Sequence, residues 1–228
     1  MKKLTLFLWV AILCTSCSTP KFLTSDVKAV DITEMLKIEP FSYISLIEKG
    51  NKSVFNDSIS NNTKVVLNES VETFRDKLRL SSEEIILTDS LDRAELEEEL
   101  RILMTAADRN QSVQNIAITP LIDSLLNANG KRFGLIIVQS GFTRTKGNYG
   151  GQIVKGIGIG ILTGLLTGIS YQQIPVKAST TLYAMIVDSQ NKNVAFYNKS
   201  FLQDAEPTKK EVIIKQLNKV FKKYFWEK

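Results

Sequence analysis

The placement of the cysteines and the absence of histidine most constrain how this chain can fold and what chemistry it can perform. The 228 residues contain two cysteines, Cys14 and Cys17, and no histidine. The body after residue 17 therefore has no disulfide and no thiolate ligand, so an apolar core must stabilise it. Without histidine, a Ser-His-Asp triad, a Cys-His dyad and every His-ligated metal site are excluded. We predict no enzyme activity, no cofactor and no metal site.

The first residues have the pattern of an export signal. Two lysines precede an apolar run from Leu4 to Leu13, which is too short for a bilayer core that requires about 20 residues. A small residue and then Cys17 follow this run, and this arrangement resembles a bacterial lipoprotein signal. The resemblance implies a signal peptide at 1–16, acylation of Cys17 and a lipidated tether at 17–30. The alternative is an ordinary secretory signal in which the cysteines are incidental.

The tether and the charge balance indicate where the chain acts. Surface-exposed lipoproteins of the Bacteroidetes often carry an acidic run directly after the Cys, and residues 18–25 here contain no carboxylate. The sequence therefore resembles the periplasm-facing kind, which implies the periplasmic face of the outer membrane. Loss of the two signal lysines leaves a net charge of only +3, too small to indicate a nucleic-acid partner. The expected partners are the membrane, through the lipid anchor, and an envelope protein.

The remaining chain has the composition of one globular domain, which we place at 31–228, because 43% of all residues are apolar and 23% are charged. A hairpin is predicted within 41–60, and helical spacing of apolar residues begins at Thr63. Residues 85–87 are predicted to form a short buried strand. A helix capped by Asp89 or Ser90 follows. Its predicted inward face consists of Leu91, Leu96, Leu100, Leu103, Met104 and Ala107.

The same helix carries a cluster of glutamates between residues 95 and 99. Glu97 is predicted to pair with Arg101, four residues later. The remaining carboxylates are expected to face solvent, so the cluster is not predicted to form a catalytic pair.

The second half is richer in strands. A helix is predicted between Pro120 and Gly130, and the apolar run 133–140 is typical of a central strand covered on both faces. Residues 180–188 and 194–202 flank a polar turn and predict an antiparallel hairpin. A closing amphipathic helix, opened by Pro207, should pack across this hairpin. The predicted class is α+β, with a mixed or antiparallel sheet packed by amphipathic helices.

This order of elements resembles a family of envelope lipoproteins. A buried strand, an insertion, a hairpin that turns after Asp188 and a closing helix, over about 112–226, are similar to one known domain. It is the α/β domain of the curli-secretion lipoprotein and of the lipoprotein activators of penicillin-binding proteins. The resemblance implies a non-catalytic binding or assembly module of the envelope.

A glycine-rich apolar insertion at 147–170 stands out from the rest of the chain. Gly156, Gly160, Gly164 and Gly168 recur at every fourth position, so on a helix they would form one stripe that a second backbone can approach closely. One interpretation is that the segment packs against its own domain. The alternative is a membrane-inserting, self-associating subunit that uses 156–168 and forms a homo-oligomer. A phosphate-binding loop is disfavoured because no Gly-Lys-Ser/Thr closes the pattern.

The closing helix is strongly basic. Lysines at 209, 210, 215, 219, 222, 223 and 228 oppose only Glu211 and Glu227. The simpler interpretation is a solvated outer face that complements the negative end of the helix. The alternative is a basic amphipathic helix that binds anionic lipid or an acidic partner.

Overall fold

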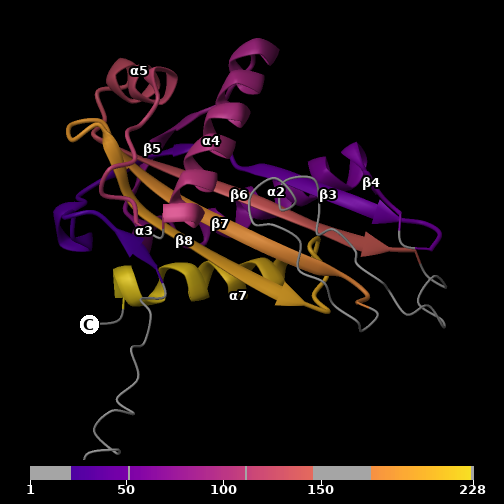
Figure 1. Cartoon of the computed structure of the whole chain (residues 1–228). Helices are drawn as coiled ribbons and strands as arrows, with labels where there is room; N and C mark the ends of the chain where they lie inside the picture. Colours follow the sequence, from indigo (N-terminus) through magenta and orange to yellow (C-terminus); the bar gives the residue numbers. More distant parts are fainter. Residues whose placement is uncertain (1–21, 51, 111, 146–175, 227–228) are drawn as a thin grey trace, which may run out of the picture.

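A long central strand, β6 (Phe133–Arg144), organises the fold (Figure 1). The computed structural model describes residues 22–50, 52–110, 112–145 and 176–226. Within these residues, eight strands form one mixed sheet in the order β1-β8-β7-β6-β2-β5, and β3 and β4 extend it beside β6. The other strands are β1 (Leu23–Thr24), β2 (Met35–Ile38), β3 (Phe41–Ile47), β4 (Ser53–Phe55), β5 (Leu80–Ile85), β7 (Ser179–Asp188) and β8 (Asn193–Gln203).

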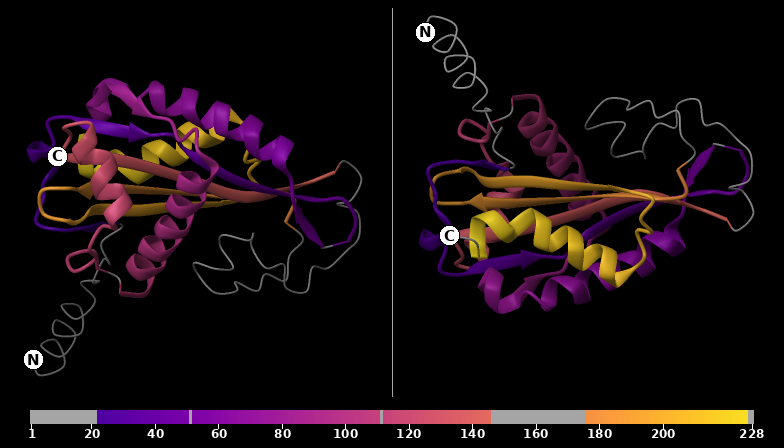
Figure 2. Two further views of the ribbon diagram at one scale, coloured as in Figure 1. Left: turned by 90° about the horizontal axis from the view of Figure 1, so that it is seen from above. Right: turned by 90° about the horizontal axis from the view of Figure 1, so that it is seen from below.

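The helices lie in two layers, one on each face of the sheet (Figure 2). The helical elements are α2 (Asp57–Glu72), α3 (Arg75–Leu78), α4 (Ser90–Asn110), α5 (Pro120–Ala128), α7 (Lys210–Phe221), and the short turns η1 (Ala29–Asp31) and η2 (Lys222–Trp226). Helices α4 and α5 pack on Ile136 and Val138 of β6, whereas α2, α3 and α7 pack on Leu135 and Ile137. Alternate side chains of β6 are thus buried on opposite faces, as the apolar run predicted. The α+β class with a mixed sheet is confirmed.

Strand β6 is parallel to its neighbours on one side and antiparallel to its neighbour on the other. It pairs in parallel with β2 and β3 and antiparallel with β7. Strands β2 and β3 lie end to end on the same side of β6, joined at Glu39 and Pro40, and β5 pairs with the outer side of β2. Proline donates no backbone hydrogen bond, so the outer edge of the sheet is interrupted where β2 passes into β3.

The elements predicted in the first half of the chain are present, but the residues at which they begin and end differ from the prediction. The hairpin is present as β3 and β4. The helix predicted from Thr63 begins earlier, at Asp57, because the Asn56 side chain accepts the Ile59 N–H at 2.9 Å and caps it there. The strand predicted at 85–87 is instead β5, which ends at Ile85; Ile86 is 62% exposed.

Helix α4 buries most of its predicted face. Leu96, Leu100 and Ala107 are buried with their neighbours, but Leu91 is 78% exposed, and its prediction as an inward residue was wrong. The predicted pair of Glu97 with Arg101 is also wrong. Arg101 pairs with Glu98, and Glu97 pairs with Arg93.

The second-half predictions are closer to the structure. The hairpin is β7 and β8, and α7 packs across both strands. The helix begins at Lys210 rather than at Pro207. Among the described residues, no helix has the length and apolar character needed to cross a bilayer.

The folded domain begins before the predicted boundary at residue 31. Strand β1 pairs antiparallel with β8, and Val27 is buried. The hydroxyl of Tyr224 donates a hydrogen bond to the Val27 carbonyl at 2.9 Å. Residues 22–30, predicted as part of the tether, therefore pack on the sheet, while 1–16, 17–21 and the insertion 147–170 lie outside the described residues.

Candidate functional site

A pocket lies at the interrupted outer edge of the sheet. Strand β5 stops pairing where the Glu39 N–H donates to the Ile85 carbonyl at 2.9 Å. Strand β4 begins pairing with β3 only at Ser45, opposite Phe55. Between these two strands, no described strand covers the edge of β3, and a pocket of about 600 Å³ opens there. This volume lies within the range of ligand-binding cavities.

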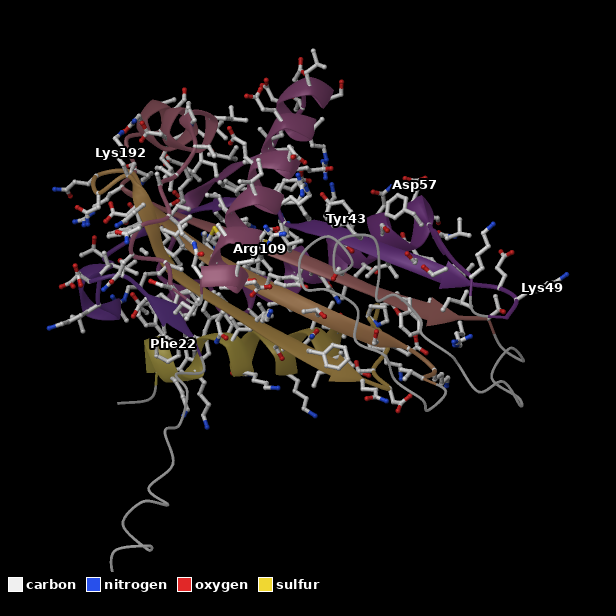
Figure 3. All side chains as sticks on the ribbon, viewed as in Figure 1. Phe22, Tyr43, Lys49, Asp57, Arg109 and Lys192 are labelled. Carbon is white, nitrogen blue, oxygen red and sulfur yellow. The ribbon has the colours of Figure 1, made fainter. Side chains whose placement is uncertain are left out.

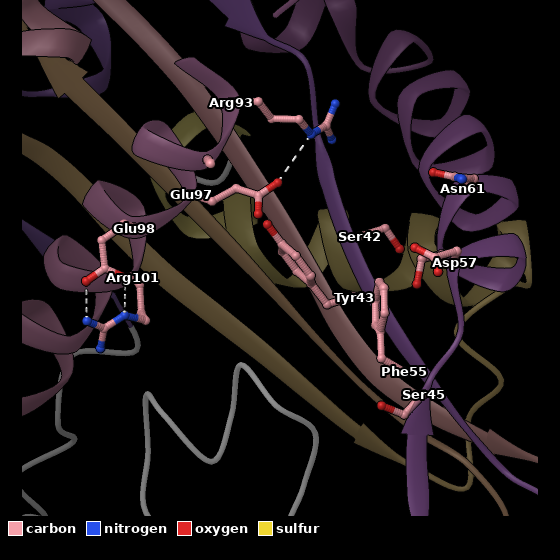
Figure 4. A pocket seen from close by; sticks show the side chains of 12 residues that line it. Ser42, Tyr43, Ser45, Phe55, Asp57, Asn61, Arg93, Glu97, Glu98 and Arg101 are labelled. Atoms are coloured by element: carbon pink, nitrogen blue, oxygen red, sulfur yellow. Dashed lines mark hydrogen bonds and ion pairs between the residues drawn. The ribbon is translucent and has the colours of Figure 1, made fainter. Parts of the chain in front are cut away.

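Four elements surround the pocket, and Figure 4 shows their side chains. The lining residues are Ser42, Tyr43 and Ser45 of β3, Phe55 of β4, Asp57, Ser60 and Asn61 of α2, and Arg93, Ala94, Glu97, Glu98 and Arg101 of α4. The rings of Tyr43 and Phe55 lie 6.5 Å apart, centroid to centroid, and form an aromatic surface. Charged groups of α4 stand on one side of these rings, and the first turns of α2 stand on the other.

The Ser60 side chain binds the outward-facing backbone of β3 at Ile44 and leaves the next outward-facing residue, Ser42, open. The Ile44 N–H donates to the Ser60 hydroxyl at 2.9 Å, and the Ile44 carbonyl accepts the Asn56 N–H at 3.0 Å. Because strand residues alternate in direction, Ser42 presents its backbone to the same outer edge. The Ser42 hydroxyl is buried and has no hydrogen-bond partner within the described structure. The pocket thus contains an unsatisfied polar group beside an open strand edge.

The charged groups that α4 contributes to the pocket are paired. Arg93 Nε lies 3.2 Å from Glu97 Oε1, and Arg93 Nη1 lies 3.4 Å from Glu39 Oε2. The Arg101 Nε donates to Glu98 Oε2 at 2.7 Å. Pairing neutralises most of the local charge but leaves many donors and acceptors directed at the pocket. Such a wall suits an uncharged polar ligand better than a single ion.

Tyr43 remains a neutral phenol. Burial, and then the neighbouring Glu97 carboxylate, raise the pKa of Tyr43 above its usual value. The hydroxyl is therefore a hydrogen-bond donor throughout the physiological pH range. Figure 4 shows it directed at the Glu97 side chain.

The structure brings together residues that the sequence did not single out as a site. Cys17, Gly156, Gly160, Gly164 and Gly168, the predicted lipidation and contact residues, lie outside the described residues. Glu97 and Glu98 were predicted as a solvated face, and both line the pocket. Tyr43 and Arg93 were missed as site residues because they are 50 positions apart; Pro40 is the local signal for the break in the edge.

Within the ranges that the structure describes, no group of three or more Asp, Glu, Cys or His side chains is placed to hold a metal ion.

The comparisons with known proteins give little further information. No protein-family model matches the chain, and no curated protein matches it. Two solved structures of the PelC dodecamer from Paraburkholderia phytofirmans, one of them a point variant, are similar in fold. They have 6% and 7% sequence identity and a TM-score of 0.37, over 90% of this chain and 95% and 97% of theirs. At this level of similarity, nothing about function follows.

Proposed function

We propose that this protein is a cell-envelope lipoprotein, anchored through Cys17 at the periplasmic face of the outer membrane, which binds a partner without catalysis. The partner is an envelope protein, and an extended segment of it docks in the pocket at the open edge of β3. The anchor rests on the export pattern that ends at Cys17.

One observation carries the binding site: the pocket exposes a strand edge beside a buried, unpartnered hydroxyl at Ser42. An extended peptide can pair with such an edge through its backbone, while a neighbouring pocket selects its side chain. Glu39 and Ile44 already have backbone partners, so the outward-facing backbone of Ser42 between them is the position left for an added segment. The rings of Tyr43 and Phe55 would contact the apolar part of that segment.

The pairing within the pocket supports binding over catalysis. Each arginine is bound to a carboxylate, and the phenol of Tyr43 is held neutral, so the groups that β3 and α4 direct at the pocket are already engaged or neutral; Asp57, at the exposed start of α2, is the lining carboxylate for which no ion pair is found among the described residues. Paired donors and acceptors fix the position of a polar partner instead.

Site-specific photocrosslinking tests the docking site. A benzophenone amino acid at Asn61, in the pocket, should give one discrete, protease-sensitive adduct in cells, and the same group at Lys192 should not. Ser42→Pro removes the outward N–H and should abolish the adduct, whereas Ser42→Ala keeps the N–H, removes only the hydroxyl and should weaken the adduct without abolishing it. A melting curve for each variant confirms folding. Identical adducts from Asn61 and Lys192, or an adduct unaffected by Ser42→Pro, would contradict the proposal.

The anchor is tested separately. Cys17→Ala should release the protein from membranes or block its maturation, and it should abolish fatty-acid incorporation. A variant that fractionates and migrates like the unchanged chain, with its fatty acid retained, would overturn the lipoprotein assignment.

A further inference from the structure

The outer surface of α7 and η2 carries an exposed row of lysines. Lys215, Lys219 and Lys223 are four residues apart and exposed, so they lie along one side of the helix. The opposite side is buried, with Leu217 and Phe221 fully inside the core. The apolar face of this helix is therefore already packed against the core. The lysine row faces outward, where it can bind a partner outside the domain.

The charge of this surface is not balanced among the described residues. Between residues 209 and 226 the chain carries six lysines and one glutamate. Lys209 and Lys210 have nearby carboxylates in Glu211 and Glu69. For Lys215, Lys219 and Lys223, no ion pair is found among the described residues. A one-sided cluster of cations of this kind attracts an anionic surface.

Aromatic side chains adjoin the lysines at the end of the helix. Tyr224, Phe225 and Trp226 are only partly buried. Trp226 stacks on Phe74 with centroids 5.7 Å apart, and Lys77 Nζ lies 5.7 Å from the Trp226 ring centre. Aromatic rings beside lysines are typical of protein surfaces that lie in the headgroup region of a bilayer.

The start of the described chain lies at the same surface. The Phe22 ring is 5.9 Å from the Tyr224 ring, and Figure 3 shows Phe22 beside the end of α7. Phe22 follows Cys17 by five residues, a distance of at most about 18 Å along an extended chain. An acyl anchor at Cys17 would therefore hold this end of the domain next to the bilayer. Tyr43 and Asp57, at the pocket, are labelled well away from Phe22 in the same view.

We propose that the surface formed by Lys215, Lys219, Lys223 and the η2 aromatics rests on anionic lipid headgroups of the membrane that holds the anchor. The inference builds on the proposed anchor, since Cys17 brings the surface and the bilayer together. The anchor at Cys17 holds the chain at the bilayer, and the basic surface adds an electrostatic contact with anionic headgroups that orients the domain. Contact at this end leaves the β3 pocket directed away from the lipid.

The single tryptophan of the mature chain provides the measurement. Trp9 lies in the predicted signal, so Trp226 is the only tryptophan after Cys17. A chain that starts at Ser18 keeps every described residue and lacks the anchor, so it tests the surface alone. It should bind vesicles of phosphatidylethanolamine with phosphatidylglycerol, with a blue shift of Trp226 emission, and it should not bind phosphatidylcholine vesicles. Brominated lipid should quench the emission.

Charge-reversal variants show whether vesicle binding depends on this particular surface or only on the net charge of the chain. Lys219→Glu with Lys223→Glu should weaken vesicle binding at least about tenfold, because each lysine near an anionic surface contributes about 1 kcal/mol. Lys49→Glu with Lys52→Glu makes the same charge change at the far turn between β3 and β4 and should have little effect.

Three results would overturn the inference: equal losses for both double variants, unchanged Trp226 emission on bound vesicles, or self-association in place of vesicle binding. Because the chain that starts at Ser18 lacks Cys17, a failure of that chain to bind vesicles would not argue against the anchor. Conversely, if the Cys17→Ala variant showed that the anchor is absent, vesicle binding by the chain that starts at Ser18 would still support peripheral membrane binding.

Discussion

Arg132 holds the fully buried carboxylate of Asp188 through two parallel hydrogen bonds. The Arg132 Nε and Nη2 atoms lie 2.9 Å and 2.8 Å from the two Asp188 oxygens. The same carboxylate accepts the N–H groups of Gln190 and Asn191, at 2.9 Å and 3.2 Å. Asp188 therefore fixes the turn between β7 and β8 and ties it to the start of β6.

Replacing Asp188 should destabilise the domain. Asp188→Ala leaves the turn amides and the exposed Arg132 without their acceptor, and loss of a buried acceptor of several hydrogen bonds costs about 1–3 kcal/mol. The midpoint of urea unfolding measures the effect. Lys192→Gln, which breaks the exposed pair with Asp123 on the same turn, serves as the control and should cost at most about 1 kcal/mol. Similar losses for both variants would contradict the role assigned to Asp188.

Phe221→Ala should be among the most damaging substitutions in α7. The side chain is fully buried and its ring stacks on Phe196 at 5.8 Å between centroids. Removal of a core phenylalanine costs about 3–5 kcal/mol, which is a large part of the stability of a typical domain. Lys215→Ala, on the exposed side of the same helix, should change the urea midpoint little. Equal and small shifts would show that α7 is not essential to the core.

Lys37 makes stability depend on pH. Its ammonium group, 2% exposed, binds Glu72 and Asn68 of α2 and lies 3.1 Å from Glu84 of β5. Partial burial alone raises the pKa of Glu72, but hydrogen bonds from Lys37 and Arg75 outweigh it and lower the pKa below 4.5.

A group with a lowered folded-state pKa stabilises the fold above its unfolded pKa, and this stabilisation is lost as the pH falls through the folded value. The chain should therefore lose stability below about pH 4.5. Lys37→Met should be less stable than the unchanged chain at pH 7, and the difference should shrink on acidification. Urea unfolding at a series of pH values tests this. A difference that is constant with pH would rule out the pairing with Glu72 as its source.

The glycine pattern predicts a position-specific effect outside the described residues. If Gly156, Gly160, Gly164 and Gly168 form a contact stripe, Gly164→Leu places a bulky side chain on it, whereas Thr163→Leu does not. Packing within the domain predicts a loss of about 1–3 kcal/mol with no change in assembly, and this is the outcome we expect. A self-associating segment predicts smaller oligomers at an unchanged melting temperature. Identical behaviour of the two variants would mean that the spacing is accidental.

Local periodicity predicted the elements of this fold but not the contacts between distant segments. The α4 face of Leu96, Leu100 and Ala107 follows from helical spacing alone. The same spacing failed at Leu91, which lies in the first turn of α4 and is exposed. Parallel pairing of β2 and β3 with β6 joins segments about 100 residues apart, and no local pattern records it.

The candidate pocket was unpredictable for the same reason. Tyr43, Asp57 and Arg93 come from a strand and two helices, and only the mixed sheet brings them to one edge. The glutamates of α4 have the composition of a solvated surface, and nothing in their spacing distinguishes Glu97 from Glu95. Pro40 is the one local signal that could have marked a break in this edge.

The antiparallel register of β6 and β7 has a consequence for the evolution of the chain. These strands pair from Phe133 with Asp188 to Phe142 with Ser179, so the residues between them join the two ends of a hairpin. A hairpin closes equally well over a turn of a few residues or a much longer stretch, because closure entropy grows only slowly with length. Related chains can therefore lengthen, shorten or recompose this connection without disturbing the sheet. The domain and its glycine-rich connection are free to diverge at different rates.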